Sequence, residues 1–152
     1  MNFHIRKLEE SDVAIAQELF ILFKKVFFDL VITQDDLPDK EYIQSLLAKD
    51  SFHIFVALDG DVIIGGVTLF ELDMYMKKSK EAYIYDIAVD KTVRHKGVAT
   101  ALVDAIRSYG QDRGIEVVFV EASTNDIDAV AFYESLGIEK EYVTHFNIEI
   151  KN

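Results

Sequence analysis

One segment of the chain, residues 83–100 with the sequence YIYDIAVDKTVRHKGVAT, constrains the fold more than any other. A β-rich run ends and, a few residues later, the pattern Arg94-x-x-Gly97-x-Ala99 opens a helix. The first N–H groups of a helix lack partners within it and carry partial positive charge, so they can hold a phosphate. Small residues let the backbone approach a diphosphate, and the basic run from Arg94 to Lys96 adds positive charge. The segment therefore predicts a strand followed by an anion-binding helix start.

The spacing of this motif excludes the two common nucleotide fingerprints. A Walker A loop needs G-x-x-x-x-G-K-S/T, and a dinucleotide site needs G-x-G-x-x-G followed by an acidic residue. The residues are similar instead to the Q/R-x-x-G-x-G/A loop with which the GNAT N-acetyltransferases grip the pyrophosphate of acetyl-CoA. Downstream, AVAFYESLGI at residues 129–138 resembles the A-x-x-F-Y-x-x-L-G-F helix and turn of the same superfamily. Between Leu19 and Ile150 the chain resembles one branch most closely, the gentamicin-type aminoglycoside 3-N-acetyltransferases.

The resemblance implies a site for acetyl-CoA and a general acid. The helix start would bind the pyrophosphate, and the pantetheine arm would lie along the preceding strand like an extra strand. The resemblance places the Tyr133 hydroxyl beside the CoA sulfur, where a phenol can protonate the departing thiolate; core packing is the alternative role for this tyrosine. The implied cofactor-binding residues are Ile87, Ala88, Val89, Arg94, His95, Lys96, Gly97, Val98, Ala99, Thr100, Asn125 and Tyr133.

Hydrophobic periodicity and turn residues predict the other elements of the fold. Helices are expected at residues 13–28 with Ser11 as cap, from Asp39 onward, at 97–113 and at 128–136. Strands are expected at residues 3–7, 52–58, 62–70, 83–89, 116–121 and 140–150, with a hairpin turn at Asp59-Gly60. This order predicts one α/β domain with a mixed, mainly antiparallel sheet, and the GNAT fold implied by the resemblance has the same order.

Length and composition favour a single enzyme-sized domain. With 152 residues and 50% hydrophobic content the chain can bury an ordinary core, so we expect one domain over residues 1–152. The absence of Cys excludes disulfides, thiolate metal sites and a cysteine nucleophile, and the histidines form no metal-binding pattern. No signal pattern and no apolar run of roughly 20 residues is found, so we expect a cytoplasmic protein.

The net charge indicates the kind of partner. With 27 acidic and 16 basic residues the net charge is −11, which repels nucleic acid and anionic membranes and attracts cations. Solubility alone also explains such a charge. Beside the acetyl-CoA motif, it favours a cationic small-molecule amine as the acceptor substrate. Phenylalanines of the 13–28 helix, where exposed, would favour a homodimer.

Asp86 is a carboxylate inside a β-rich run. Strand alternation would place Ile84, Asp86 and Ala88 on one face and Tyr83, Tyr85, Ile87 and Val89 on the other. A buried carboxylate needs a partner, and a substrate ammonium beside the thioester is one; a nearby Lys or Arg is the other. Asp86 is therefore predicted to bind the acceptor amine, to accept its proton, or both.

Other acidic residues are candidates for the acceptor site. Glu121 ends the next strand and is a second candidate base, although the gentamicin branch tends to have Gln there and an Asp at the position of Ser123. Asp35, Asp36 and Asp39 occupy the loop between the first two helices, and Asp126 precedes the Tyr133 helix. Solvated charge and helix capping are the alternative roles of these residues.

The leading interpretation is direct transfer of acetyl from acetyl-CoA to the 3-amino group of an aminoglycoside, which would confer antibiotic resistance. Acetylation of a polyamine, of a small amine or of a peptide N-terminus remains open, since acidity suits any cation. A non-catalytic acyl-CoA-binding module is a further alternative.

Overall fold

The computed structural model describes residues 1–151, which form two compact units. A mixed five-stranded sheet lies at the centre of the first unit. The first unit is Met1–Glu121, and the second begins at Ala122. The strands are β1 (His4–Lys7), β2 (Phe52–Asp59), β3 (Val62–Asp73), β4 (Lys80–Val89) and β5 (Ile115–Val120). They lie in chain order; only β4 and β5 run parallel. The expected α/β class with a mainly antiparallel sheet is confirmed.

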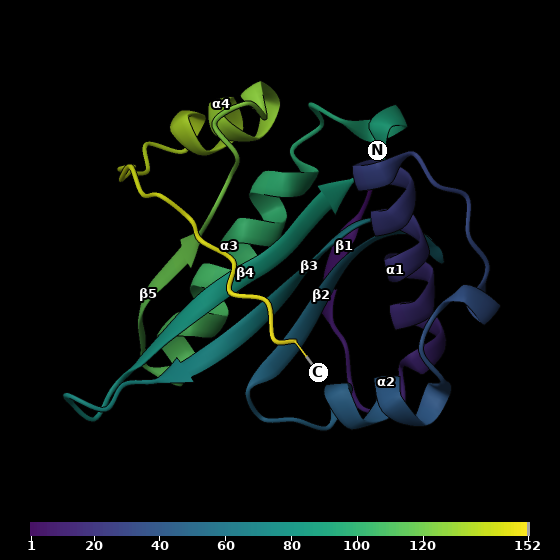
Figure 1. Ribbon diagram of the computed structural model, residues 1–152. Coiled ribbons are helices and arrows are strands. Elements are labelled where there is room, and N and C mark those ends of the chain that lie inside the picture. Colours follow the sequence, from purple (N-terminus) through teal and green to yellow (C-terminus); the bar gives the residue numbers. More distant parts are fainter. Residues whose placement is uncertain (152) are drawn as a thin grey trace. The chain divides into compact units, whose positions relative to one another are not determined.

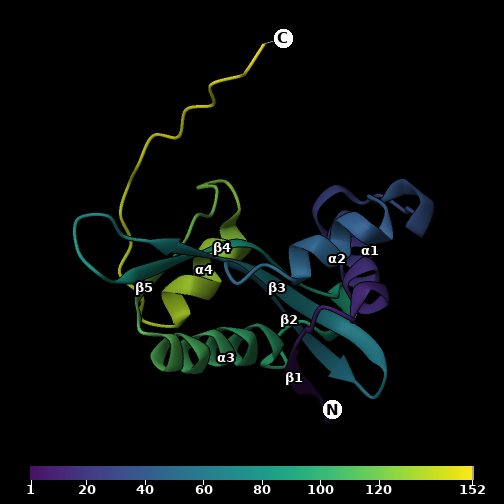
Figure 2. The ribbon, with the colours of Figure 1, turned by 90° about the horizontal axis from the view of Figure 1, so that it is seen from below.

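Helices cover both faces of this sheet (Figures 1 and 2). One face carries α1 (Val13–Phe28) and α2 (Lys40–Leu47), and the other carries α3 (Val98–Arg113). Short 3₁₀ turns, η1 (Gln34–Asp36) and η2 (Lys91–Val93), precede α2 and α3. The expected cap Ser11 is wrong by one position, because Asp12 occupies the N-cap of α1 and its carboxylate accepts a hydrogen bond from the Glu9 N–H at 2.7 Å. No helix among the described residues is long and apolar enough to cross a membrane.

The strand β2 divides its side chains between two cores. Phe52, Ile54, Val56 and Leu58 pack with α1 and α2, whereas Phe55 and Ala57 pack with α3. Burial of apolar side chains on both sides supplies the main stabilisation of such a layered unit. The α1 side is packed closely, since a Cβ at Gly66 of β3 would lie 2.7 Å from Leu19 Cδ2. Glycine at this position therefore lets α1 approach the sheet.

A β-bulge in β4 changes the predicted alternation around Asp86. Asp86 pairs with Thr68, but the next pair is Ile84 with Leu69, so Tyr85 is an extra residue on β4. As a result Ile84 packs in the α3 core, whereas Ala88 packs in the α1 core. The expectation that Ile84 and Ala88 share a face is wrong, because the bulge reverses the alternation between them.

The second unit contains α4 (Ile127–Ser135), which begins at the Asp126 N-cap and is followed by Gly137 with φ of 69°. The helix expected at residues 128–136 is thus confirmed. Residues 138–151 form neither helix nor strand, so the final strand predicted at residues 140–150 is wrong. Alternation of apolar residues indicates which side chains would lie on one face of a strand. A strand also needs a neighbouring strand as hydrogen-bonding partner, and alternation does not predict that partner.

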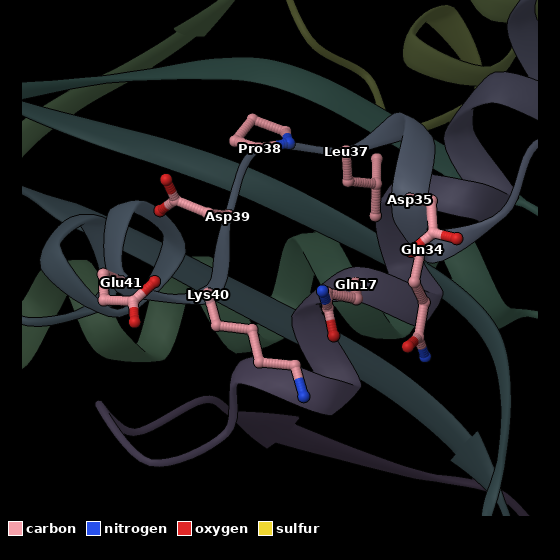
Figure 3. A pocket seen from close by; sticks show the side chains of 8 residues that line it. All are labelled: Gln17, Gln34, Asp35, Leu37, Pro38, Asp39, Lys40 and Glu41. Carbon is pink, nitrogen blue, oxygen red and sulfur yellow. The ribbon is translucent and has the colours of Figure 1, made fainter.

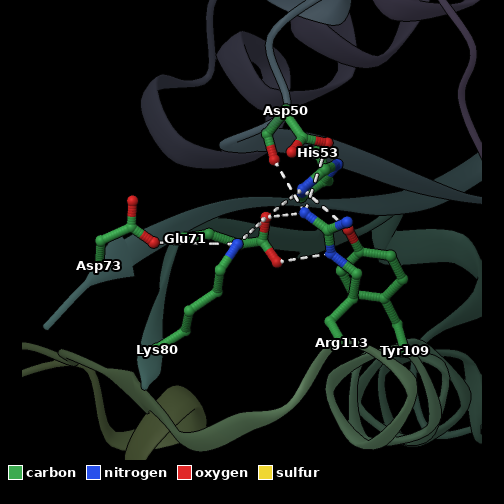
Figure 4. Close-up of polar contacts among 7 residues, drawn as sticks. All are labelled: Asp50, His53, Glu71, Asp73, Lys80, Tyr109 and Arg113. Atoms are coloured by element: carbon green, nitrogen blue, oxygen red, sulfur yellow. Dashed lines mark hydrogen bonds and ion pairs between the residues drawn. The ribbon is translucent and has the colours of Figure 1, made fainter. Parts of the chain in front are cut away.

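A buried polar cluster joins β2, β3 and α3 (Figure 4). The Glu71 carboxylate, with a side chain only 2% exposed, accepts hydrogen bonds from Arg113 Nε at 3.0 Å and Nη2 at 2.8 Å. His53 Nε2 lies 3.1 Å from Glu71 Oε2 and 2.9 Å from the Tyr109 hydroxyl. Burial alone would raise the pKa of Glu71, but the hydrogen bonds from Arg113 and His53 outweigh burial and hold its pKa at about 2. The carboxylate is therefore charged at neutral pH, and Arg113 neutralises it.

Replacing this carboxylate should lower stability in a pH-dependent way. A carboxyl whose pKa falls from its usual 4.5 to about 2 stabilises the fold by about 3 kcal/mol above pH 4.5. This stabilisation is lost as pH falls from 4.5 towards 2, where the native carboxylate becomes protonated. We expect Glu71→Gln to unfold at lower urea concentration at pH 7, with a difference from wild type that narrows at pH 3. Asp73→Asn, whose side chain is 88% exposed, should change stability little at either pH. If the unfolding midpoints of wild type and Glu71→Gln differed by the same urea concentration at pH 7 and pH 3, this explanation would be wrong.

Candidate functional site

The connection from β4 to α3 presents the backbone of a helix start. Asp90 follows β4, and Gly97 with φ of 82° is the N-cap of α3. By helix geometry, the N–H groups of Val98, Ala99 and Thr100 have no partner within the helix. A Cβ at Gly97 would meet no described atom within 4 Å beyond those of its chain neighbours, so the space beside this N-cap residue is open. The predicted anion-binding helix start is present in the structure.

Left-handed backbone and positive charge accompany the helix start. His95 has φ of 61°, an uncommon conformation for a residue other than glycine. The side chains of Arg94, His95 and Lys96, which immediately precede the helix start, are all exposed. Hydrogen bonds from the N–H and hydroxyl of Thr92 hold the pKa of Asp90 at about 2, and Lys25 lies 3.2 Å away. These contacts fix the connection while leaving the basic side chains available to an anion.

The strand β4 has an open edge immediately before this connection. Its parallel pairing with β5 ends at the Ile84–Val120 pair, where β5 itself ends. Within the first unit, residues 85–89 therefore have no strand partner on that edge. The unpaired edge contains Ile87, Ala88 and Val89, the residues predicted to lie along the pantetheine arm. An extended ligand can add to such an edge as a strand does.

Asp86 lies at the bulge and is partly buried. Its backbone N–H donates to Thr68 Oγ1 at 3.1 Å. Burial raises the pKa of the Asp86 carboxyl, and the positive charge of Lys24 on α1 opposes this shift. Lys24 was not predicted as a site residue, because the separation of 62 positions hides its approach to β4. A carboxylate with a raised pKa is suited to accept a proton from an amine.

Tyr83 connects the two candidate bases. Burial raises the pKa of its hydroxyl, and Glu121, Tyr85 and Asp86 act in the same direction; Glu121 also hydrogen-bonds to it. The Tyr83 ring stacks on Phe119 of β5, with ring centroids 5.0 Å apart. The structure thus brings Asp86 and Glu121 to one region through a residue that was not predicted. The alternating tyrosines beside Asp86 were the only sequence signal for it.

The second unit holds the predicted acid and its neighbours. Burial raises the pKa of Tyr133 to about 12, and the negative charge of Asp126 contributes. The hydroxyl therefore stays protonated at neutral pH and can donate. Asp126 Oδ1 accepts a hydrogen bond from the Ala129 N–H at 3.1 Å, which caps α4, and the Asn125 N–H donates to Ser123 Oγ at 3.4 Å. The cofactor contact of Asn125 and the substrate contact of Asp126 stay predictions.

Acidic residues of the loop before α2 cap local turns or line a pocket. Asp36 Oδ2 accepts a hydrogen bond from the Thr33 N–H at 2.8 Å, and Asp39 Oδ1 accepts one from the Tyr42 N–H at 2.8 Å. Both residues therefore cap local turns. A pocket of about 530 Å³ opens beside them between α1, η1 and α2 (Figure 3). Its polar lining residues are Gln17, Gln34, Asp35, Asp39, Lys40 and Glu41.

Comparison with known proteins identifies relatives. A model of the acetyltransferase (GNAT) family matches residues 16–138. Two crystal structures of aminoglycoside acetyltransferases from an uncultured soil metagenomic sample are each 35% identical, with TM-scores of 0.92. One covers 99% of this chain and 100% of its own; the other, in complex with sisomicin, covers 98% and 97%. An aminoglycoside N-acetyltransferase in complex with CoA shares the fold at 19% identity and a TM-score of 0.78, covering 97% of this chain and 95% of its own.

Curated relatives are matched over smaller parts of the chain. Human N-acetyltransferase 8 is 24% identical over 84% of this chain. N-alpha-acetyltransferase 30 of Schizosaccharomyces pombe is 35% identical over 55% of this chain. The chain spans 56% and 55% of the lengths of these two proteins. Their names describe two kinds of N-acetyltransferase, so these relatives do not define one acceptor.

The helix start can be tested with two matched glycines of α3. Gly97 and Gly114 flank the helix with φ of 82° and 70°, and neither would clash as alanine. Each Gly→Ala change should cost about 1 kcal/mol of stability, because alanine disfavours left-handed backbone. Only Gly97→Ala should also weaken CoA binding, by about tenfold in calorimetric titration, since its methyl group enters the open space. Equal CoA affinities in the two variants would show that the pyrophosphate binds elsewhere.

Proposed function

This chain belongs to the GNAT family of acetyltransferases, which use acetyl-CoA, and on that premise we propose that it acetylates the 3-amino group of an aminoglycoside. The observation that carries the proposal is the arrangement along β4, with Asp86 on the strand that leads to the bare helix start. A polyanionic cofactor and a cationic acceptor would thus meet on one strand. The sisomicin complex of a 35% identical neighbour supports the aminoglycoside class.

In the proposed reaction, acetyl-CoA binds first through its pyrophosphate at residues 94–100, and its pantetheine arm lies along the open edge of β4. The acceptor enters as an ammonium ion, and Asp86 takes a proton from it, directly or through water, so that the nitrogen lone pair can attack. The nitrogen forms a bond to the thioester carbonyl carbon, and a backbone N–H of β4 stabilises the oxyanion. The C–S bond then breaks, Tyr133 donates its proton to the thiolate, and the nitrogen gives up its second proton through water to the Tyr133 phenolate, so that a neutral amide, CoA thiol and the Tyr133 hydroxyl result.

We propose Glu121 as the alternative base, since it approaches Asp86 through Tyr83. Asp35, Asp36 and Asp126 are proposed to supply further negative charge to the acceptor. We further propose that the two units act as one GNAT domain. Acetylation of a peptide N-terminus is the second candidate function, favoured by the similarity to N-alpha-acetyltransferase 30.

An amine panel tests the proposed acceptor. Release of CoA thiol from acetyl-CoA should be fast with sisomicin and other aminoglycosides and slow with spermidine or peptides. Mass spectrometry and NMR of the product should place the acetyl group on the 3-amine. Release only with peptides would favour the second candidate, and CoA binding without release across the panel would favour the non-catalytic module.

The pH dependence of the reaction tests Asp86. Because only the deprotonated carboxylate accepts a proton, kcat/KM should fall as pH decreases through the pKa of Asp86, which burial raises above its usual 3.8. Asp86→Asn should lower kcat about a hundredfold or more and remove this acidic limb. Glu121→Gln is the matched control, and loss of the limb in Glu121→Gln alone would assign the base to Glu121 instead.

Tyr133→Phe tests the general acid. This change should lower kcat about tenfold to a hundredfold with CoA affinity within about twofold of wild type, because the ring is kept and only the donor is lost. Since the pKa of Tyr133 is about 12, wild-type kcat should show no basic limb from this residue below about pH 10. An unchanged kcat would leave Tyr133 with a packing role.

A further inference from the structure

Asp90 connects three elements at the point where the chain passes from β4 towards α3. Its backbone N–H donates to the Ile64 carbonyl of β3 at 2.9 Å, and its own carbonyl accepts from the Val93 N–H at 3.0 Å. Its Oδ1 accepts hydrogen bonds from the Thr92 N–H at 2.9 Å and from the Thr92 hydroxyl at 2.7 Å. Its Oδ2 accepts from Lys25 Nζ on α1 at 3.2 Å. Asp90 therefore links the connection to β3, to η2 and to α1.

The backbone that follows Asp90 needs support from its surroundings. His95 has φ of 61° and Gly97 has φ of 82°, both in the left-handed region. This conformation is strained for a residue other than glycine and persists only where neighbouring contacts hold the chain. Asp90 lies five residues before His95 in the same connection. Its contacts hold the beginning of the connection, and the predicted pyrophosphate site forms its end.

Attraction of the cofactor does not explain a carboxylate at this position. Hydrogen bonds from Thr92 hold the pKa of Asp90 at about 2, so the side chain is negatively charged at neutral pH. A negative charge in the connection that binds a pyrophosphate repels it. Lys25 supplies the opposite charge from α1, a helix that packs closely on β3 where Leu19 meets Gly66. The contacts of Asp90 within the chain are therefore the reason for its presence.

We propose that Asp90 and Lys25 are positioning residues for acetyl-CoA, which hold the start of α3 in the conformation that binds the pyrophosphate. Neither residue contacts the cofactor; both act through the backbone of the connection. The inference rests on the part of the proposed function that binds acetyl-CoA at residues 94–100, and it does not depend on which amine is the acceptor.

Asp90→Asn distinguishes positioning from electrostatic repulsion by the sign of its effect. Removal of a negative charge would by itself tighten the binding of CoA. Loss of the ion pair with Lys25 and of the charge-assisted bonds from Thr92 should weaken it. We expect Asp90→Asn to raise the Kd for CoA about fivefold in calorimetric titration. A Kd equal to or below that of wild type would overturn the proposal.

Lys25→Met tests the partner on α1 at a position that tolerates replacement, because the Lys25 side chain is 57% exposed. We expect this change to raise the Kd for CoA about threefold, and Lys25→Arg to restore the wild-type value. Lys77→Met is the matched control, since Lys77 is 61% exposed, pairs with Glu116 and precedes the opposite end of β4. Equal weakening in Lys25→Met and Lys77→Met would assign the effect to net charge alone and overturn the proposal.

The double variant Lys25→Met/Asp90→Asn tests whether the two residues act as one unit. Each single change breaks the same ion pair, so the Kd of the double variant should be close to that of Asp90→Asn alone. If the two effects multiplied, the residues would act independently and the proposal would be wrong. A lower melting temperature with an unchanged Kd for CoA would likewise overturn it, because the pair would then serve stability only.

Gly97→Ala separates failure of this proposal from failure of the site on which it rests. If Gly97→Ala weakens CoA binding and the variants of Asp90 and Lys25 do not, the positioning role is wrong while the pyrophosphate site stands. If none of these variants changes the Kd for CoA, the predicted pyrophosphate site is wrong and the positioning role with it.

Discussion

The separation of β4 from β5 is the constraint on which the first unit depends. The two strands pair only as far as Ile84 and Val120, and the bulge at Tyr85 lies immediately beyond. If the pairing continued, β5 would occupy the edge that contains residues 87–89, and an extended ligand could not add there. The bulge also turns Asp86 and Ala88 towards α1. The end of β5 therefore leaves an open backbone edge, and the bulge beside it supplies a partly buried carboxylate.

The sign of the charge differs between the start of α3 and the rest of the chain. The chain carries a net charge of −11, yet the start of α3 has three consecutive basic residues, all exposed. A cofactor with phosphate groups needs this local reversal of sign, because the field of the rest of the molecule repels it. The same field attracts a cationic acceptor. The acidic excess and the basic loop thus have complementary effects on the two substrates of a GNAT acetyltransferase.

Local signals in the sequence predicted most of the first unit. Residues 13–28 form the predicted helix, since the apolar stripe and the backbone preferences agree, and the predicted hairpin at Asp59-Gly60-Asp61 is present, with Gly60 and Asp61 in the turn. The helix start at Gly97 was equally predictable, because its chemistry lies within a few consecutive residues. Non-local features were not predictable: the bulge depends on pairing between β3 and β4, and the influence of Lys24 on Asp86 depends on packing of α1 against the sheet. The strand expected at residues 140–150 failed for the same reason.

Gln17 illustrates why sequence alone misses the burial of a polar side chain. In the sequence it is one polar residue in an otherwise apolar helix, and surface exposure would be the ordinary explanation. The structure instead buries it, and the neighbouring carboxylates come from a loop about 20 residues later. Its Oε1 has no hydrogen-bond partner among the described residues, so an apolar side chain would cost less free energy at this position.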